Sequence, residues 1–293
     1  MSGCVGENGG IMRFAKAHGT GNDFIVLPDP DGEIDLTAAF VAALCDRRRG
    51  IGGDGVLRVV RSAKHPDATH LAADAEWFMD YYNSDGSIAE TCGNGIRAFA
   101  RYLAVSGLVS AVPARQLPIA TRAGLVAVDI DADLITVDMP VPVVGPANWT
   151  AVAGVTYRGP SVNVGNPHVV VTVPDRSTLD SLDLRDQPLF DIDTFPSGVN
   201  LEFVTPTAPI DGVDLHVDMR VHERGSGETL SCGSGTCAVA AVALRDAGLA
   251  RGRVAVDVPG GRLIIEIDVD RCRLTGPAVV VATGEINVAD VAG

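Results

Sequence analysis

Apolar and polar residues alternate along much of the chain with the period of two that is typical of half-buried strands. The alternation is clearest at residues 135–139 and 263–269. Residues 169–173 and 279–281 are continuous β-branched runs, which also favour strands. Gly, Pro, Asp and Asn interrupt these runs at short intervals, so the pattern predicts antiparallel sheets joined by turns.

Two segments have helical patterns instead, and each follows a cysteine. After Cys92, positions 96, 99, 100 and 103 are apolar, and Gly107 is a suitable residue to end the helix. After Cys232, residues 236–244 include no charged residue, so this helix should be buried on every side. Strands wrapped around a central helix would satisfy both patterns.

The two helical segments belong to a longer internal repeat. Cys92 and Cys232 are 140 positions apart and have similar neighbours, Thr-Cys-Gly-Asn-Gly and Ser-Cys-Gly-Ser-Gly. Three further features recur at nearly the same spacing: Gly21-Asn22 and Gly165-Asn166, Gly107-Leu108 and Gly248-Leu249, and Gly124 and Gly261. The repeat predicts a duplicated domain. The expected fold class is α+β, with two pseudo-symmetric domains, each an antiparallel β-barrel-like sheet around a central α-helix.

Composition agrees with two soluble domains. The chain has 293 residues, of which 46% are apolar, enough for two cores of ordinary size. A net charge of −14 argues against nonspecific binding to nucleic acid or to an anionic membrane. Neither a secretory signal nor an apolar run approaching the ~20 residues of a membrane span is evident. We expect a cytoplasmic protein whose six cysteines are reduced.

A thiol at a helix start can act in proton transfer. The macrodipole and the backbone N–H groups there favour the thiolate, and they can lower the thiol pKa by about 1–4 units. Cys92 and Cys232 could therefore supply an acid and a base. Cys4, Cys45, Cys237 and Cys272 lack this setting and are interpreted as small apolar residues.

Five motifs in order resemble the diaminopimelate epimerase family. They are His18-Gly-Thr-Gly-Asn-Asp-Phe24, Glu90-Thr-Cys-Gly-Asn-Gly95, Gly165-Asn-Pro-His168, Glu223-Arg-Gly-Ser-Gly-Glu-Thr229 and Ser231-Cys-Gly-Ser-Gly-Thr236. The resemblance covers nearly the whole chain, from about residue 12 to 281. It implies a cofactor-independent epimerase, without metal, that interconverts LL- and meso-diaminopimelate in lysine and peptidoglycan precursor synthesis. It also implies domains at 12–127, with 278–293 added, and at 128–277.

The resemblance implies a role for each matched residue. Cys92 is the expected proton donor and Cys232 the acceptor in one direction, with the roles exchanged in the other. His168 and Glu223 are expected to tune the thiols. The expected substrate-binding residues are Asn22, Asn83, Gly93, Asn94, Asn166, Asn200, Glu223, Arg224, Gly233 and Ser234. The backbone N–H groups of the glycines and their neighbours would bind the reacting carboxylate, and Arg224 would bind the distal one.

Two positions depart from the family pattern. Many members have a glutamine where this chain has Gly55, so no side-chain contact is carried over to that position. Ala282 stands where some relatives have a tyrosine associated with dimerisation. A homodimer is still the expected assembly, and a small-molecule substrate is the expected ligand.

Three alternatives remain at this point. Proline racemases and 4-hydroxyproline epimerases share the two-cysteine chemistry, but their substrates lack a second amino-acid centre, and the Glu223-Arg224 pair favours diaminopimelate. Isomerases of the phenazine-biosynthesis type have a carboxylic acid in place of the thiols. A metal-binding module using Cys232, Cys237, His168 and His222 would have weak ligand spacing.

Overall fold

The computed structural model describes residues 10–90, 92–109 and 114–291, which fold into two compact units. The N-terminal unit comprises the described residues up to Val137 and from Pro277 onward, and the C-terminal unit is Asp138–Gly276. The boundary between the two units, after Val137, lies ten residues beyond the one expected after residue 127. Strands β6 (Gly124–Ile130) and β7 (Leu134–Met139) pair as a hairpin, and this hairpin holds β7 beside the N-terminal sheet.

The N-terminal sheet runs in the order β18, β1, β2, β3, β4, β5, β6, β7. The bounds of the remaining strands are β1 Ile11–Gly19, β2 Asn22–Pro28, β3 Gly55–Arg61, β4 Trp77–Asn83, β5 Ala114–Thr121 and β18 Val279–Asn287. The β2–β3 and β4–β5 pairs are parallel and the others antiparallel. Parallel neighbours need a crossover. The first crossover contains α1 (Ala38–Cys45) and the second contains α2 (Gly93–Val105).

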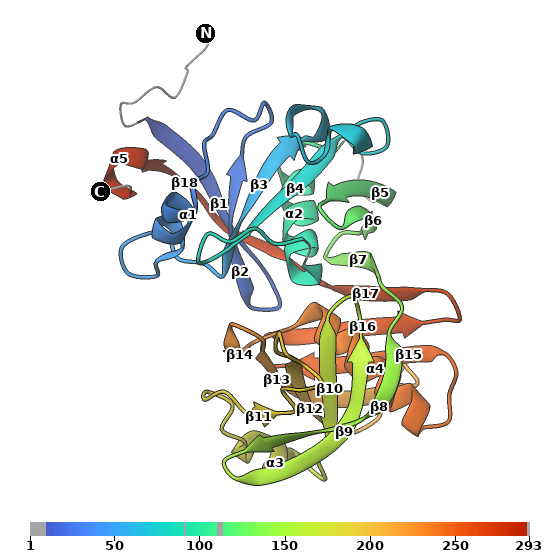
Figure 1. The fold of residues 1–293 in the computed structure, drawn as a ribbon. Coiled ribbons are helices and arrows are strands. Elements are labelled where there is room, and N and C mark those ends of the chain that lie inside the picture. The colour runs from blue at the N-terminus through green and yellow to red at the C-terminus, as the bar shows by residue number, and fades with distance from the viewer. Residues whose placement is uncertain (1–9, 91, 110–113, 292–293) are drawn as a thin grey trace. The chain divides into compact units, whose positions relative to one another are not determined.

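Helix α2 forms the centre of this unit (Figure 1). It contacts β1, β2, β3, β4, β6 and β18. Its residues Ile96, Phe99 and Leu103 are at most 1% exposed, as the apolar spacing predicted. Two 3₁₀ turns, Ser62–Lys64 and Thr69–Leu71, lie between β3 and β4, and the short α5 (Val288–Val291) follows β18.

The C-terminal sheet runs in the order β8, β9, β10, β12, β13, β15, β16, β17. Its strands are β8 Val143–Val152, β9 Val155–Asn163, β10 Pro167–Thr172, β12 Asn200–Pro206, β13 Leu215–Glu223, β15 Gly252–Val258, β16 Gly261–Ile267 and β17 Cys272–Pro277. The short strands β11 (Leu189–Phe190) and β14 (Gly227–Thr229) pair with β8 and β13. Helix α3 (Arg176–Ser181) lies in the crossover between the parallel strands β10 and β12.

Helix α4 (Gly233–Asp246) lies in the second parallel crossover of this unit, between β13 and β15. It packs against seven strands, which are β8, β9, β10, β12, β13, β15 and β16. Cys237, Ala238, Val239 and Ala240 are completely buried, as expected for a helix without charges over most of its length. Their small side chains allow strands to approach from several directions.

The two units therefore repeat one topology, with parallel pairs and central helices at equivalent places. Matched glycines support this equivalence, because Gly107 and Gly248, which follow the helices, have φ of 68° and 72°. The expected α+β fold class is confirmed. The prediction that each sheet is antiparallel was wrong, because each sheet includes two parallel pairs that are joined by helical crossovers. Strand β16 ends at Ile267, so the prediction was wrong for Val269, which is 84% exposed beyond it.

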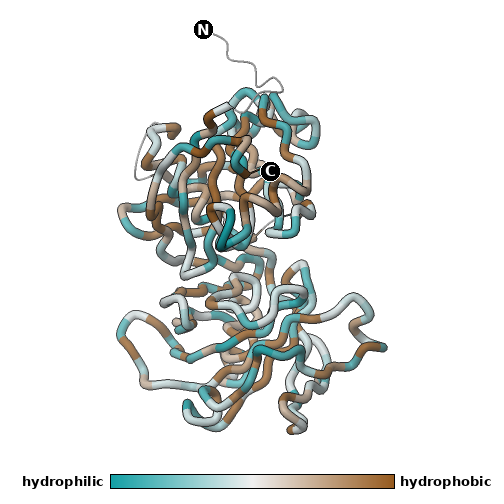
Figure 2. The backbone as a smooth tube through the Cα atoms, turned by 90° about the vertical axis from the view of Figure 1, so that its left-hand side faces the viewer, coloured by the Kyte–Doolittle hydropathy of each residue, from teal (hydrophilic) through white to brown (hydrophobic). Residues whose placement is uncertain are grey.

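Apolar residues concentrate in the strands and central helices of each unit (Figure 2). In the C-terminal unit, the core includes Val239, Val254, Leu263, Ile265 and Leu274. Within the described residues, every helix is too short or too polar to cross a membrane.

Candidate active site

Cys92 is the N-cap of α2. Its φ and ψ of −154° and 122° are extended, so the chain enters the helix only at Gly93. The Sγ accepts a hydrogen bond from the Gly95 N–H at 3.5 Å. An N-cap side chain normally accepts such a bond through oxygen, and here the thiol occupies that position. Helix geometry directs the N–H groups of the first turn, on Gly93 and Asn94, toward the same end.

An asparagine pair lies beside this thiol. The Cys92 Sγ is 3.7 Å from Asn22 Oδ1, and Asn94 donates its Nδ2 to the same oxygen at 3.3 Å. Asn22 Nδ2 donates to Asp54 Oδ2 at 2.7 Å, which fixes the direction of the amide. The buried Arg97 donates to Asn94 Oδ1 at 2.6 Å. The structure thus brings together three of the predicted residues, Asn22, Cys92 and Asn94.

Asn83 and Gly55 face each other across β3 and β4. Asn83 donates its Nδ2 to Ser87 Oγ at 3.0 Å, in the turn after β4, and not to the groups around Cys92. A Cβ at Gly55 would lie 2.4 Å from the Tyr82 carbonyl oxygen. Glycine at this position is therefore required by the close approach of the two strands.

Cys232 is the N-cap of α4 and has equivalent local geometry. Its Sγ accepts the Gly235 N–H at 3.4 Å and lies 3.5 Å from Ser234 Oγ. The residue is only 5% exposed. The backbone N–H groups of Gly233 and Ser234 lie in the first helical turn, as those of Gly93 and Asn94 do in α2.

Glu223, at the end of β13, neighbours the Cys232 thiol and accepts a hydrogen bond from the Thr229 hydroxyl. Burial raises the pKa of Glu223, and the neighbouring Glu202 raises it further. Burial also raises the pKa of Cys232 well above its usual value, and the charges of Glu223 and Glu202 add to that effect. The expectation that the helix start favours the thiolate was therefore wrong for Cys232. Burial and the two carboxylates raise the pKa of the thiol by more than the helix N-terminus lowers it.

His168 lies at the start of β10 and is completely buried. Its Nδ1 is 2.6 Å from Glu202 Oε1, and its Nε2 is 2.9 Å from Asn166 Oδ1. Glu202, on β12, is also completely buried. His168 is thus held from both sides, and the carboxylate that holds it also affects the pKa of Cys232.

Arg224 and Asn200 adjoin the Glu223 segment. Asn200 accepts the Arg224 backbone N–H at 3.0 Å and donates its Nδ2 to the Pro167 carbonyl at 3.1 Å. The Arg224 side chain is exposed, with Nη1 3.4 Å from the Ser197 carbonyl oxygen. Asn200 therefore ties the turn before β10 to the turn after β13, while the guanidinium faces solvent.

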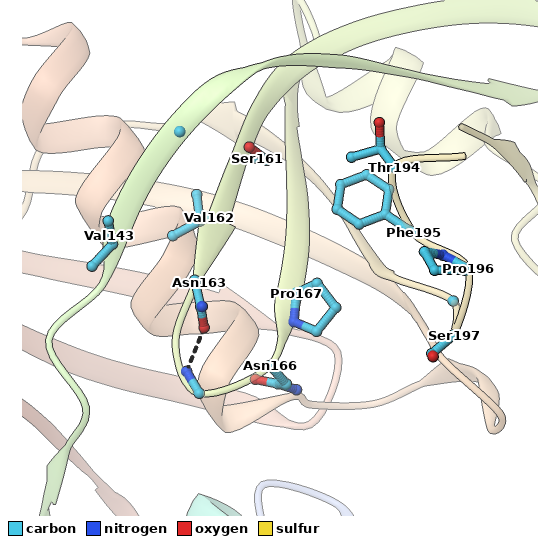
Figure 3. Close-up of a pocket in the computed structure, with 13 residues that line it drawn as sticks. Val143, Ser161, Val162, Asn163, Asn166, Pro167, Thr194, Phe195, Pro196 and Ser197 are labelled. Atoms are coloured by element: carbon cyan, nitrogen blue, oxygen red, sulfur yellow. Dashed lines mark hydrogen bonds between the residues drawn. The ribbon is translucent and has the colours of Figure 1, made fainter. Parts of the chain in front are cut away.

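A cavity of about 460 Å³ opens beside these residues within the C-terminal unit. Asn166 and Pro167 lie on one side of it, and Thr194, Phe195 and Ser197 lie on the other (Figure 3). Asn163 Oδ1 accepts the Gly165 N–H at 2.9 Å and so shapes the turn that carries Asn166. Gly165 has φ of 85°, as this turn requires.

The residues of the alternative metal site do not gather. The ring nitrogens of His222 are hydrogen-bonded to the Leu184 carbonyl oxygen and to Gln187 Oε1. Cys237 is buried in the core of the unit. In the part of the chain that the structure describes, no group of three or more His, Cys, Asp or Glu side chains is arranged to hold a metal ion.

Sequence reasoning missed Glu202 and Asp54, which contact predicted site residues. Glu202 interrupts the apolar run Leu201–Val204, and a charge in a fully buried strand was the available signal. Asp54 lies within Gly-Gly-Asp-Gly, where an aspartate suggests only a turn.

Comparison with known proteins gives one consistent family. A family model described as "Diaminopimelate epimerase" matches residues 14–144 and 160–288. A protein named diaminopimelate epimerase from Streptomyces coelicolor is 50% identical, with 96% of this chain and 98% of that protein covered. Proteins with the same name from Thermobifida fusca and Corynebacterium glutamicum are 49% and 47% identical, each over 94% of this chain and 98% and 99% of their own lengths.

Solved structures with low sequence identity share the fold. A phenazine biosynthesis protein of the PhzF family from Bacillus anthracis superimposes with a TM-score of 0.70 at 16% identity, covering 94% of this chain and 99% of that one. A hydroxyproline epimerase from Agrobacterium vitis gives 0.65 at 15% identity, covering 96% and 92%. At these identities the likeness concerns architecture alone.

Proposed function

Since the chain belongs to the diaminopimelate epimerase family, we propose that Cys92 and Cys232 carry out its reaction, the interconversion of LL- and meso-diaminopimelate. The family membership confirms the resemblance seen in the five motifs. Inversion of the α-carbon requires removal of a proton from one face and delivery of a proton to the other. In one direction, the Cys232 thiolate accepts the α-proton and the Cys92 thiol donates its proton, and the reverse reaction exchanges these roles.

The observation that best supports this assignment is the pairing of the Cys232 thiol with the neighbouring Glu223 carboxyl group, whose charge acts on the thiol. Mutual repulsion and burial raise the pKa values of both groups, so two negative charges on this pair are disfavoured. In the proposed reaction Cys232 acts as a base when Glu223 carries a proton, a state that the raised pKa of Glu223 favours and the raised pKa of Cys232 opposes. Glu223 thereby lets a buried thiol act as a proton acceptor.

The carbanion formed on the substrate needs stabilisation without an electron sink. The first-turn N–H groups at Gly93 and Asn94 in α2, and at Gly233 and Ser234 in α4, suit a reacting carboxylate because both helix starts favour anions. We assign the distal carboxylate to Arg224, which has an exposed fork of donors and whose backbone N–H is bound by Asn200. Asn22, Asn83 and Asn166 complete the proposed binding set.

We also propose that the protein acts as a homodimer in the cytoplasm. The family resemblance supports the dimer, although Ala282, on β18, replaces the tyrosine associated with dimerisation in some relatives. Light scattering of the purified protein measures this directly, and a mass of about 61 kDa, twice the chain mass of 30.4 kDa, is expected.

The proposed function is tested by incubating the purified, reduced protein with LL-diaminopimelate in deuterated water. We expect deuterium at the α-carbon and formation of the meso isomer, without added pyridoxal phosphate. Proline and trans-4-hydroxyproline serve as comparison substrates and should not exchange. Exchange with those substrates but not with diaminopimelate would contradict the proposal.

A further inference from the structure

Glu202 is the buried charged group of the Cys232 half-site that the proposed proton transfer does not use. It lies on β12, between the completely buried Leu201 and Phe203, with no exposure of its own. Its Oε1 is 2.6 Å from His168 Nδ1, and its Oε2 has no hydrogen-bond partner among the described residues. A buried carboxylate with one oxygen unsatisfied is costly, and such groups are retained where they have a task.

The backbone of α4 is shaped to admit this carboxylate. A Cβ at Gly235 would lie 2.6 Å from Glu202 Oε1 and 3.2 Å from its Cγ and Cδ atoms. The same Gly235 donates its N–H to the Cys232 thiol at 3.4 Å. Glu202 therefore packs against the first helical turn that carries the thiol, at a position where only glycine leaves room.

His168 depends on Glu202 for its orientation. The 2.6 Å contact of Nδ1 with the carboxylate fixes the plane of the ring and directs Nε2 at Asn166. A carboxylate that orients an imidazole in this way typically affects turnover more than binding.

We propose that Glu202 is a positioning residue of the Cys232 half-site, which fixes the direction of the His168 ring and places a carboxyl group beside the first turn of α4. This inference rests on the proposed function of Cys232 and His168. The charged and titratable groups facing the thiol are Glu223 from β13, Glu202 from β12 and, through Glu202, His168 from β10. Ser234 and the Gly235 N–H face it from α4 itself.

The test combines Glu202→Gln, which keeps the size of the side chain but removes its charge, with Glu266→Gln as a control. Glu266 is an exposed residue on β16 of the same unit, paired with Arg253 at 3.7 Å. For each variant, kcat, KM and the pH dependence of Cys232 alkylation are measured, the last by mass spectrometry of the Cys232 peptide. The alkylation readout does not require activity.

We expect Glu202→Gln to lower kcat about 10-fold or more while KM changes less than about 3-fold. The midpoint pH for alkylation of Cys232 should fall by roughly one unit, because a nearby negative charge is removed. Glu266→Gln should match the wild type in all three measurements. A folded Glu202→Gln protein with wild-type kcat and an unshifted midpoint would overturn the inference.

A second variant covers the case in which Glu202→Gln does not fold. Glu202→Asp keeps the charge but withdraws the carboxylate by one methylene, so kcat should fall while the alkylation midpoint stays at the wild-type value. A wild-type kcat for this variant would show that the contact with His168 has no positioning role. Failure of the wild type itself to exchange deuterium would instead refute the proposed function, and the alkylation shift would still report on the charge of Glu202.

Discussion

Asn22 Oδ1 lies 3.7 Å from the Cys92 sulfur, and the same amide gives its Nδ2 to Asp54 at 2.7 Å. An amide can turn by 180° and exchange its donor and acceptor ends. The bond to Asp54 prevents this, so an acceptor oxygen always faces the thiol. The S–H group of Cys92 is thereby held in a defined direction.

Asp54→Ala removes the acceptor that orients Asn22, and we predict a loss of about 10-fold in kcat/KM. Thermal unfolding measured beside the kinetics separates this effect from a loss of stability, since Asp54 also accepts the Asp23 N–H. Asp31→Ala is the matched control, because Asp31 is an exposed partner of Arg61 in the same unit. A reduced Tm with full kcat/KM would refute the orienting role of Asp54.

Cys92→Ala and Cys232→Ala should each reduce epimerisation at least about 100-fold, because an acid or base missing from one face cannot be replaced from the other. Cys237→Ala is the control. It lies in the same helix as Cys232 but is completely buried in the core, so its removal should affect stability while activity remains. Near wild-type epimerisation by either of the first two variants would disprove the two-thiol assignment.

The equivalent glycines Gly95 and Gly235 should respond differently to alanine. A Cβ at Gly235 would collide with Glu202 at 2.6 Å, whereas a Cβ at Gly95 would meet its nearest neighbour, Cys92 Cβ, at 3.4 Å. We predict that Gly235→Ala displaces Glu202 and lowers kcat about 10-fold, with a smaller loss for Gly95→Ala. Equal losses in the two variants would mean that the space for Glu202 is unimportant.

Arg224→Lys keeps the charge but loses the planar fork, and we predict a roughly 10- to 100-fold loss of kcat/KM for diaminopimelate. The Tm should be nearly unchanged because the Arg224 side chain is exposed. Arg185→Lys, another exposed arginine of this unit, is the control. Unchanged kinetics for Arg224→Lys would remove this residue from the substrate site.

Asp23 should make the N-terminal unit sensitive to acid. Burial alone would raise its pKa, but hydrogen bonds from Arg47 and Lys16 lower the pKa from 3.8 to about 2. A carboxyl with a depressed pKa stabilises the fold above its unfolded pKa, and this contribution, about 1 kcal/mol after solvent screening, is lost as the pH falls from about 4 to 2. The Tm difference between wild type and Asp23→Asn should therefore shrink between pH 7 and pH 2.5, and a constant difference would contradict this account.

The repeated elements could be predicted from sequence because each depends on local patterns. The apolar spacing at Ile96, Phe99 and Leu103 marks a buried helix face, and the glycines after the two helices mark their ends. The parallel pairings β2–β3 and β10–β12 could not be predicted, because strand alternation gives burial but not the partner of each strand. Partner choice depends on the crossovers, which are long-range features.

The places of the two cysteines at helix starts could be predicted from sequence, whereas their role in proton transfer stays a prediction. Cysteines at helix starts indicated proton transfer, and family motifs extended this interpretation to His168 and Glu223. The raised pKa of Cys232 was not predictable, because it arises from burial and from carboxylates on β12 and β13 that approach only in the folded chain. Glu202 was missed for the same reason.

The duplicated topology shows how two equivalent helix starts can hold thiols in different surroundings. Both helices begin with the same sulfur-to-amide contact, yet Asn22 and Asn94 surround one thiol and Glu223 and Glu202 influence the other. The first helical turn fixes the position of each sulfur. At Cys232, burial and the carboxylates on the neighbouring strands β12 and β13 raise the pKa of the thiol. A duplicated fold can in this way support a reaction that treats the two faces of one carbon differently, since its two halves need to differ in only a few side chains.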